Sequence, residues 1–121
     1  MSGYRDLEIY RNAYKLSIRV HKASLNLPKF ELYEQGSQIR RSTKSIKDTI
    51  SEGYGRRRYK AEFIRYLVYA QASCDEATNQ ATTIIELYPD ISEFVEINTD
   101  LDVLGRKINN FINYVETDWR T

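Results

Sequence analysis

Apolar residues recur at alternating steps of three and four positions in four separate segments of the chain. No segment shows a sustained alternation of apolar and polar residues, so the pattern predicts helices and no strands. The first stripe comprises Ile9, Ala13, Leu16, Val20, Ala23 and Leu27. We expect this first helix to end at Pro28, because proline disfavours a helical conformation in the residue before it.

The second stripe predicts a helix from about Leu32 to Gly53. Its members are Ile39, Thr43, Ile46, Ile50 and Gly53. A glycine at position 53 or 55 is expected to end this helix and to take a positive φ where the chain reverses.

The third and fourth stripes continue the same period. The third is Phe63, Leu67, Ala70, Cys74, Ala77, Ala81, Ile84 and Tyr88, and it predicts a helix from about Lys60 to Tyr88. The fourth is Ile97, Leu101, Leu104, Ile108, Phe111 and Val115. Asp90 followed by Glu93 is expected to form a capping box at the start of the last helix.

Four amphipathic helices with short connections predict an all-α fold. The most economical arrangement is an antiparallel up-and-down four-helix bundle with left-handed packing. We find no internal repeat or linker in the 121 residues, so one domain spanning residues 1–121 is expected.

Composition limits the kinds of catalytic or metal site that the chain can form. The chain has one cysteine, Cys74, and one histidine, His21, which argues against a disulfide, a zinc site and histidine-based catalysis. Glu52 and Glu76 are expected to pair with Arg40, Arg41 or Ser45 rather than to act as catalytic carboxylates. We therefore expect no enzyme activity and no cofactor. Without a signal peptide or a membrane-length apolar run, the expected location is the cytoplasm.

The net charge of +1 hides an uneven distribution along the chain. Residues 29–60 contain nine Lys or Arg and four Asp or Glu, whereas residues 61–104 contain one basic and nine acidic residues. In such a chain some helices carry mainly positive charge and others mainly negative charge. This suits an acidic or phosphate-bearing partner, or association of unlike faces of two copies.

The strongest local feature is the segment from Gly53 to Lys60, which combines glycines, tyrosines and four basic residues. On the preceding helix, Arg40, Lys44 and Lys47 form a basic stripe that is expected to point outward along the same side. Arginine can grip phosphates in a bidentate manner, and tyrosine can stack on unpaired bases. The candidate nucleic-acid-contacting residues are Arg40, Lys44, Lys47, Arg56, Arg57, Arg58 and Lys60. The alternative is that these residues lie in solvent or pair with acidic residues of another helix or subunit.

Ten tyrosines in a chain of this length exceed what a four-helix core can take up. Tyrosine is enriched at protein interfaces because it is large and has a polar tip. Together with the split of charge, this predicts a homo-oligomer with head-to-tail contacts, which close into a ring if the rotation permits.

An ordered set of motifs covers about two thirds of the chain. The motifs are YRDLEIY at 4–10, LPKFE at 27–31, QIRR at 38–41, ISEGYGR at 50–56, KAEFIRYL at 60–67, and Ser73 with Glu76. In this order they resemble the four-helix-bundle proteins encoded in intervening sequences of bacterial 23S ribosomal RNA genes, often labelled S23 ribosomal proteins. The chain departs from that pattern at Ser42, Thr49, Ser51 and Ala72, where small residues replace other small residues.

The resemblance implies a four-helix bundle assembled as a pentamer. The chain is also remotely similar to the accessory protein of diversity-generating retroelements, a basic pentamer that binds nucleic acid. The expected function is therefore a non-enzymatic oligomeric scaffold that contacts RNA or DNA. The alternative is a protein-interaction or structural oligomer with no nucleic-acid role.

Overall fold

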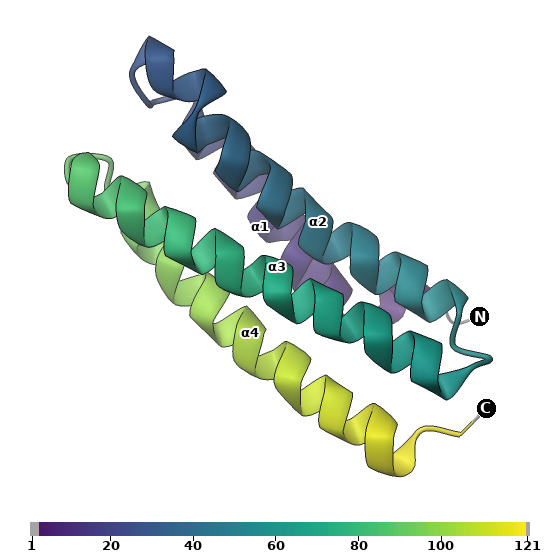
Figure 1. The fold of residues 1–121 in the computed structure, drawn as a ribbon. Coiled ribbons are helices and arrows are strands. Elements are labelled where there is room, and N and C mark those ends of the chain that lie inside the picture. The colour runs from purple at the N-terminus through teal and green to yellow at the C-terminus, as the bar shows by residue number, and fades with distance from the viewer. Residues whose placement is uncertain (1–2, 121) are drawn as a thin grey trace.

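The computed structural model describes residues 3–120, and all of its regular elements are helices (Figure 1). The four long helices are α1 (Glu8–Ser24), α2 (Gln35–Gly55), α3 (Lys60–Leu87) and α4 (Glu93–Asp118). Two short 3-10 turns, η1 (Tyr4–Asp6) and η2 (Lys29–Tyr33), precede α1 and α2. The predicted all-α class is confirmed for the part of the chain that is described.

Each helix packs beside the next one in the chain, and α4 also packs beside α1. The contacts between α1 and α4 run in opposite sequence directions, joining Glu8 to Lys107, Arg19 to Asp100, and Asn26 just after α1 to Glu93. In Figure 1 the chain turns back at each connection, and both ends of the chain lie where α2 joins α3. This places segments that are distant in sequence, including the two ends, at one end of the bundle.

The predicted stripes form the core with few exceptions. Nearly every stripe residue is buried, and Ile39, Phe63 and Leu67 have no exposed surface. Tyr88 and Phe111 are only half-buried and pack at the margin of the core. Phe94 and Ile112 of α4 are buried although they lie outside the predicted stripe. The three-and-four spacing therefore located the core faces of all four helices.

Four details of the helix ends differ from expectation. Helix α1 ends at Ser24, before the chain reaches Pro28. Helix α2 begins at Gln35 rather than near Leu32, because residues 29–33 form the 3-10 turn η2. The expected capping box of Asp90 and Glu93 does not form, since Ser92 precedes α4 and makes no side-chain cap hydrogen bond. Helix α3 ends at Leu87, one residue before the expected position.

The glycines at the end of α2 do not take the expected positive φ; no glycine among residues 3–120 does. Gly53 instead allows α2 and α3 to approach closely. A Cβ atom placed on Gly53 would lie 2.8 Å from Cβ of Tyr66, whereas one placed on Gly55 would meet nothing within 4 Å. The need for glycine at position 53 is thus a matter of packing rather than of backbone conformation.

We expect Gly53→Ala to lower the free energy of unfolding by about 1–3 kcal/mol, since the clash is with a Cβ atom and one helix must shift. Gly55→Ala is the matched control. It adds the same methyl group to open space in a helical backbone, so it should leave stability unchanged or raise it by up to about 1 kcal/mol. Urea denaturation of the two variants measures both effects, and equal stabilities would contradict the close approach of α2 and α3.

Candidate nucleic-acid interface

The seven candidate residues do not form one continuous site. Arg56, Arg57 and Arg58 lie in the connection between α2 and α3, and Lys60 begins α3. The remaining three are spread along α2 and have different surroundings. One group therefore lies at an end of the bundle and the other along α2.

The three arginines of the connection are exposed, and each lies over a tyrosine ring. The guanidinium carbon of Arg57 is 4.0 Å from the centre of the Tyr54 ring, and Nη1 of Arg57 donates a hydrogen bond of 2.9 Å to the main-chain carbonyl of Tyr54. The guanidinium of Arg56 lies 4.7 Å from the ring centre of Tyr66 on α3. Stacking holds these groups in place while their outer N–H groups still face solvent.

An open pocket of about 400 Å³ lies at this end, lined by Gly55, Arg57, Arg58, Trp119 and Arg120. Trp119 and Arg120, which follow α4, are not among the residues predicted from the sequence. An aromatic residue next to an arginine was the available signal. In an up-and-down bundle the residues after the fourth helix return to the connection between the second and third, so the topology also indicated their place.

A cluster of aromatic side chains packs around Trp119, one of the residues that line the pocket. Phe63 of α3 is fully buried, and its ring centre lies 5.2 Å from that of Trp119 and 6.0 Å from that of Tyr54. Phe111 and Tyr114 of α4 also contact the indole ring. The indole Nε1 is buried and has no hydrogen-bond partner among residues 3–120. This packing fixes Trp119 at the edge of the basic pocket.

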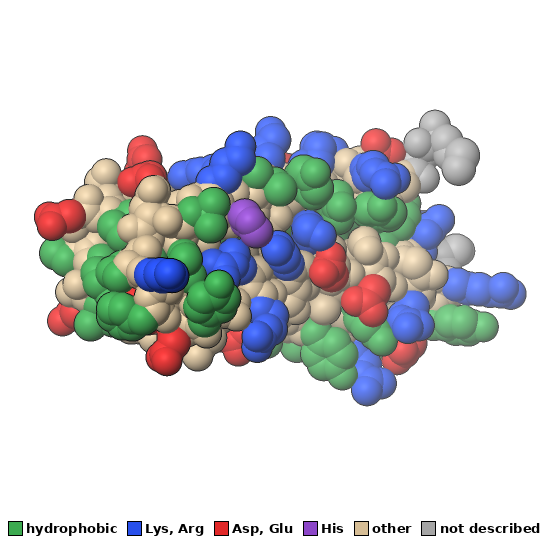
Figure 2. Space-filling model, turned by 90° about the horizontal axis from the view of Figure 1, so that it is seen from above, with side chains coloured by type: hydrophobic (Ala, Val, Ile, Leu, Met, Phe, Trp, Pro, Cys, Tyr) green, Lys and Arg blue, Asp and Glu red, His purple; other side chains and the backbone are tan. Residues whose placement is uncertain are grey.

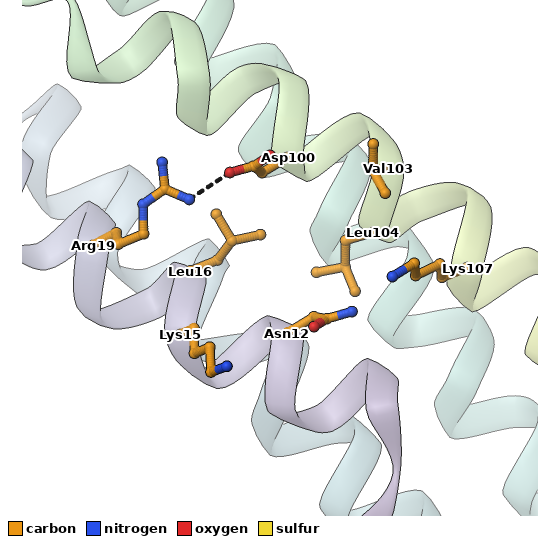
Figure 3. Close-up of a pocket in the computed structure, with 8 residues that line it drawn as sticks. All are labelled: Asn12, Lys15, Leu16, Arg19, Asp100, Val103, Leu104 and Lys107. Carbon is orange, nitrogen blue, oxygen red and sulfur yellow. Dashed lines mark hydrogen bonds and ion pairs between the residues drawn. The ribbon is translucent and has the colours of Figure 1, made fainter.

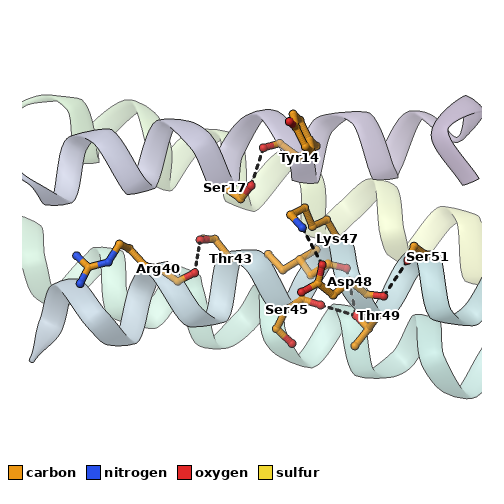
Figure 4. Close-up of polar contacts among 10 residues, drawn as sticks. Tyr14, Ser17, Arg40, Thr43, Ser45, Lys47, Asp48, Thr49 and Ser51 are labelled. Atoms are coloured by element: carbon orange, nitrogen blue, oxygen red, sulfur yellow. Dashed lines mark hydrogen bonds and ion pairs between the residues drawn. The ribbon is translucent and has the colours of Figure 1, made fainter. Parts of the chain in front are cut away.

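Lys44 and Lys47 lie where α2 faces α1. Lys44 is exposed, and its Nζ is 3.5 Å from Nδ1 of His21. Lys47 is half-buried, and Figure 4 shows it reaching toward α1 at the level of Tyr14. Its ammonium donates a 2.7 Å hydrogen bond to Asp48, and this bond raises the pKa of Lys47. The positive charge of Lys47 is therefore partly balanced by its neighbour Asp48.

Arg40 departs from the predicted outward-facing stripe. Its guanidinium donates hydrogen bonds to Oγ of Ser24, at 2.8 Å, and to the carbonyl of Leu32, at 2.6 Å. A Cβ atom on Gly36 would lie 2.9 Å from Nη1 of Arg40, so glycine at that position leaves room for the side chain. Arg40 therefore ties the segment between α1 and α2 to the bundle, far along α2 from the basic pocket.

Most of the candidate charges have no carboxylate partner. Five ion pairs are present among residues 3–120, and of the seven candidates only Lys47 takes part in one. Helices α1 and α2 together carry eight Lys or Arg and three Asp or Glu, a net charge of +5. Helices α3 and α4 carry four and ten, a net charge of −6. Figure 2 shows Lys and Arg side chains gathered around the histidine on one face.

The expected pairing of Glu52 and Glu76 is wrong: neither forms an ion pair or a side-chain hydrogen bond with the residues proposed for it. Arg41 contacts Ser37, and Ser45 contacts Ser73 instead. Nor does the described part of the chain hold a cluster of three or more potential metal ligands. The buried thiol of Cys74 donates to the carbonyl of Leu101, and burial raises its pKa to about 12, so it is not a nucleophile at neutral pH.

A pocket of about 210 Å³ between α1 and α4 has a different character (Figure 3). Leu16 and Leu104 of the core are part of its lining. Two of its cations are paired, Arg19 with Asp100 at 2.5 Å and Lys107 with Glu8 at 3.2 Å. We interpret it as the seam between two helices rather than as a binding site, because its arginine and one of its lysines are already neutralised.

The fold and the candidate surface together define a small, all-helical protein with an arginine-rich end. Its chain matches the family model described as 23S rRNA-intervening sequence protein over residues 5–110. The chain belongs to this family, as the ordered motifs predicted. A search of curated proteins found no match. No helix in the described part of the chain is long and apolar enough to span a membrane. The similarity to the retroelement accessory protein stays a prediction.

Proposed function

We propose that this protein is a non-enzymatic scaffold, an antiparallel four-helix bundle assembled with copies of itself, that contacts RNA or DNA through its basic end. One observation carries the proposal. Arg57, Arg58 and Arg120 line one pocket beside Trp119, and none of the three is paired with a carboxylate among residues 3–120.

The chemistry of this pocket suits a phosphodiester chain. A guanidinium offers several N–H groups in a plane and binds phosphate oxygens in a bidentate manner. Tyr59 is 64% exposed next to the arginines and offers a ring face on which a base can stack. Arg56 and Lys60 lie in and next to the same connection and add to the positive charge there. Lys44 and Lys47 would contact a longer nucleic acid that continues along α2.

The charge distribution supports assembly with further copies. One pair of neighbouring helices carries +5 and the other −6, so the basic side of one copy attracts the acidic side of the next. Such head-to-tail contacts form a ring where the rotation between copies closes. In a ring, the basic end would be repeated once per subunit. Individually weak phosphate contacts would then add through multivalency.

Binding of a labelled single-stranded RNA and of a duplex DNA across a salt series tests the proposal. Trp119 is the only tryptophan in the sequence and lines the pocket, so its fluorescence should change on binding. In the variant Arg57/Arg58/Arg120→Ala, the dependence of log affinity for single-stranded RNA on log salt should flatten by about 0.7 for each phosphate that is no longer neutralised. Light scattering on the same samples reports the mass of the assembly.

The control is Arg65/Arg106/Lys107→Ala. It removes the same number of positive charges, but each of these residues is paired with a carboxylate. It should keep the salt dependence of the parent protein. Equally weakened binding by the two variants would mean that only net charge matters and would contradict a site at the basic end. Absence of binding at low salt with an intact oligomer would overturn the nucleic-acid role.

A second candidate function rests on the same charge separation. In a structural or protein-interaction oligomer, the basic residues would pair with Glu62, Asp75, Glu76 or Glu86 of a neighbouring copy. Asp75, Glu76 and Glu86 have no ion-pair partner among residues 3–120, which leaves them available. Dissociation of the oligomer at high salt, without nucleic-acid binding at low salt, would favour this function over the first.

A further inference from the structure

A second hollow combines cations with aromatic rings, and the residues that line it come from η1 and the N-terminal half of α1. Its volume is about 410 Å³, and its lining residues are Arg5, Tyr10, Arg11, Tyr14 and Lys15. We call it the tyrosine pocket. None of the seven candidate residues lines it.

The two tyrosine rings differ in their exposure to solvent: Tyr10 is half-buried and Tyr14 is exposed. They are four residues apart and so lie on the same face of α1, with ring centres 6.3 Å apart and planes inclined by 33°. The ring of Tyr4 packs edge-on against Tyr10 at 4.8 Å, which holds Tyr10 in place. Tyr14 is 47% exposed. Its ring is therefore available to a planar group from solvent.

The two arginines beside these rings are held by contacts with uncharged groups, and no carboxylate among residues 3–120 neutralises them. Nη1 of Arg11 donates hydrogen bonds to the main-chain carbonyls of Arg5 and Asp6, at 3.2 and 2.5 Å. The guanidinium of Arg5 lies 4.8 Å from the ring centre of Tyr4. Neither arginine nor Lys15 forms an ion pair with any carboxylate in residues 3–120.

We propose that the tyrosine pocket binds an unpaired segment of single-stranded nucleic acid. A base stacks on Tyr14, and the flanking phosphates contact Arg5, Arg11 and Lys15. The proposal rests on the proposed function, which it deepens by naming the form of nucleic acid. A duplex keeps the faces of its bases within the stack, so it offers nothing to the open ring of Tyr14.

The open ring distinguishes nucleic acid from an acidic protein segment. Carboxylates of a partner protein, including those of a second copy, would use the three cations but gain little from an aromatic face. A base gains from both, since base–aromatic stacking contributes whatever the base. We therefore choose an experiment in which the ring is changed and the charges are kept.

The probe is a short unstructured RNA, used single-stranded and as a duplex with its complement, and the variant is Tyr14→Ala. We expect its affinity for the single strand to fall about tenfold with the salt dependence unchanged, because the substitution removes one stacking surface and leaves every cation in place. Tyr14→Phe should bind like the parent protein. Tyr33→Ala is the matched control, since Tyr33 is 80% exposed in η2 and stands beside Glu34.

Photocrosslinking gives a second readout, because it identifies the peptide that contacts the RNA. A single-stranded RNA carrying 5-iodouracil should crosslink to the peptide that contains Tyr14, and duplex RNA should not. Absence of crosslinking to this peptide in Tyr14→Ala, with the mass of the oligomer unchanged in light scattering, would support the pocket as the binding site.

Four outcomes would overturn the inference. Unchanged single-strand binding by Tyr14→Ala, alongside weakened binding by Arg57/Arg58/Arg120→Ala, would leave the proposed function intact and remove only the tyrosine pocket. Equal weakening for single strand and duplex would exclude stacking. A change of oligomer mass in Tyr14→Ala would assign the pocket to contacts between copies. Absence of any binding by the parent protein would overturn both proposals.

Discussion

Replacing Phe63 by alanine should lower the free energy of unfolding by about 3–5 kcal/mol. Phe63 has no exposed surface and lies under the end of the bundle where the arginines gather. Its ring contacts those of Tyr54, Phe111 and Trp119 at centre distances of 5.2 to 6.0 Å. Removing it takes away a large buried apolar surface and leaves a cavity lined by aromatic rings, which cannot collapse without moving away from their other neighbours.

The effect should extend to the candidate site. Trp119 rests on Phe63 and lines the pocket formed with Arg57, Arg58 and Arg120. The tryptophan emission of Phe63→Ala should therefore shift to the red before any unfolding, since the indole ring loses its apolar support. Urea denaturation followed by far-UV circular dichroism gives the free energy, and fluorescence without denaturant reports the local change.

Phe30→Ala is the control for this prediction. It deletes the same side chain at a position that is 67% exposed, in the turn η2 at the opposite end of the bundle. Its stability should stay within about 0.5 kcal/mol of the parent protein, as is usual for surface substitutions. If Phe63→Ala were no more destabilising than Phe30→Ala, the aromatic cluster would not be the support of the basic end.

The position of Phe63 in the core could be predicted because burial in a helical bundle repeats with the helical period. The same reasoning located the buried faces of all four helices and therefore the class of the fold. The role of Gly53 near the end of α2 could not be predicted in this way. The sequence predicts a positive φ for a glycine at this place, but Gly53 instead makes room for Tyr66. That role depends on how α3 packs against α2 and not on local sequence.

The candidate site was predicted less completely than the fold. The exposure of Arg56, Arg57 and Arg58 follows from their place in a short connection between helices. Arg40 has the same residue type and a helical register that points it outward, yet it bonds to Ser24 and a main-chain carbonyl. A long flexible side chain takes whichever hydrogen-bond acceptors the fold brings near it, and these are not visible in the sequence.

Trp119 and Arg120 could not be predicted for a different reason. They lie beyond the last apolar stripe, so periodicity gives no reason to single them out. Only the return of the fourth helix to the connection between α2 and α3 brings them beside Arg57 and Arg58. The pocket is assembled from the connection between α2 and α3 and from the segment after α4, so its residues are brought together by the topology rather than by local sequence.

The stability of the protein should fall as pH rises above 9, and Cys74 should account for much of the fall. Burial raises the pKa of the Cys74 thiol from 9.0 to about 12, with smaller contributions from Asp75 and Asp102. Between these values the unfolded chain loses a proton that the folded chain retains, so the free energy of unfolding decreases with pH. A difference of three pKa units corresponds to a decrease of up to about 4 kcal/mol by pH 12.

The variant Cys74→Ala isolates this contribution. Alkali acts on other groups as well, since the hydrogen bond to Glu31 raises the pKa of the Tyr88 hydroxyl, but those groups are common to both proteins. The difference in unfolding free energy between parent and variant should therefore be constant below pH 9 and shrink above it. A constant difference up to pH 12 would mean that the thiol ionises equally well in both states and is not enclosed between α3 and α4.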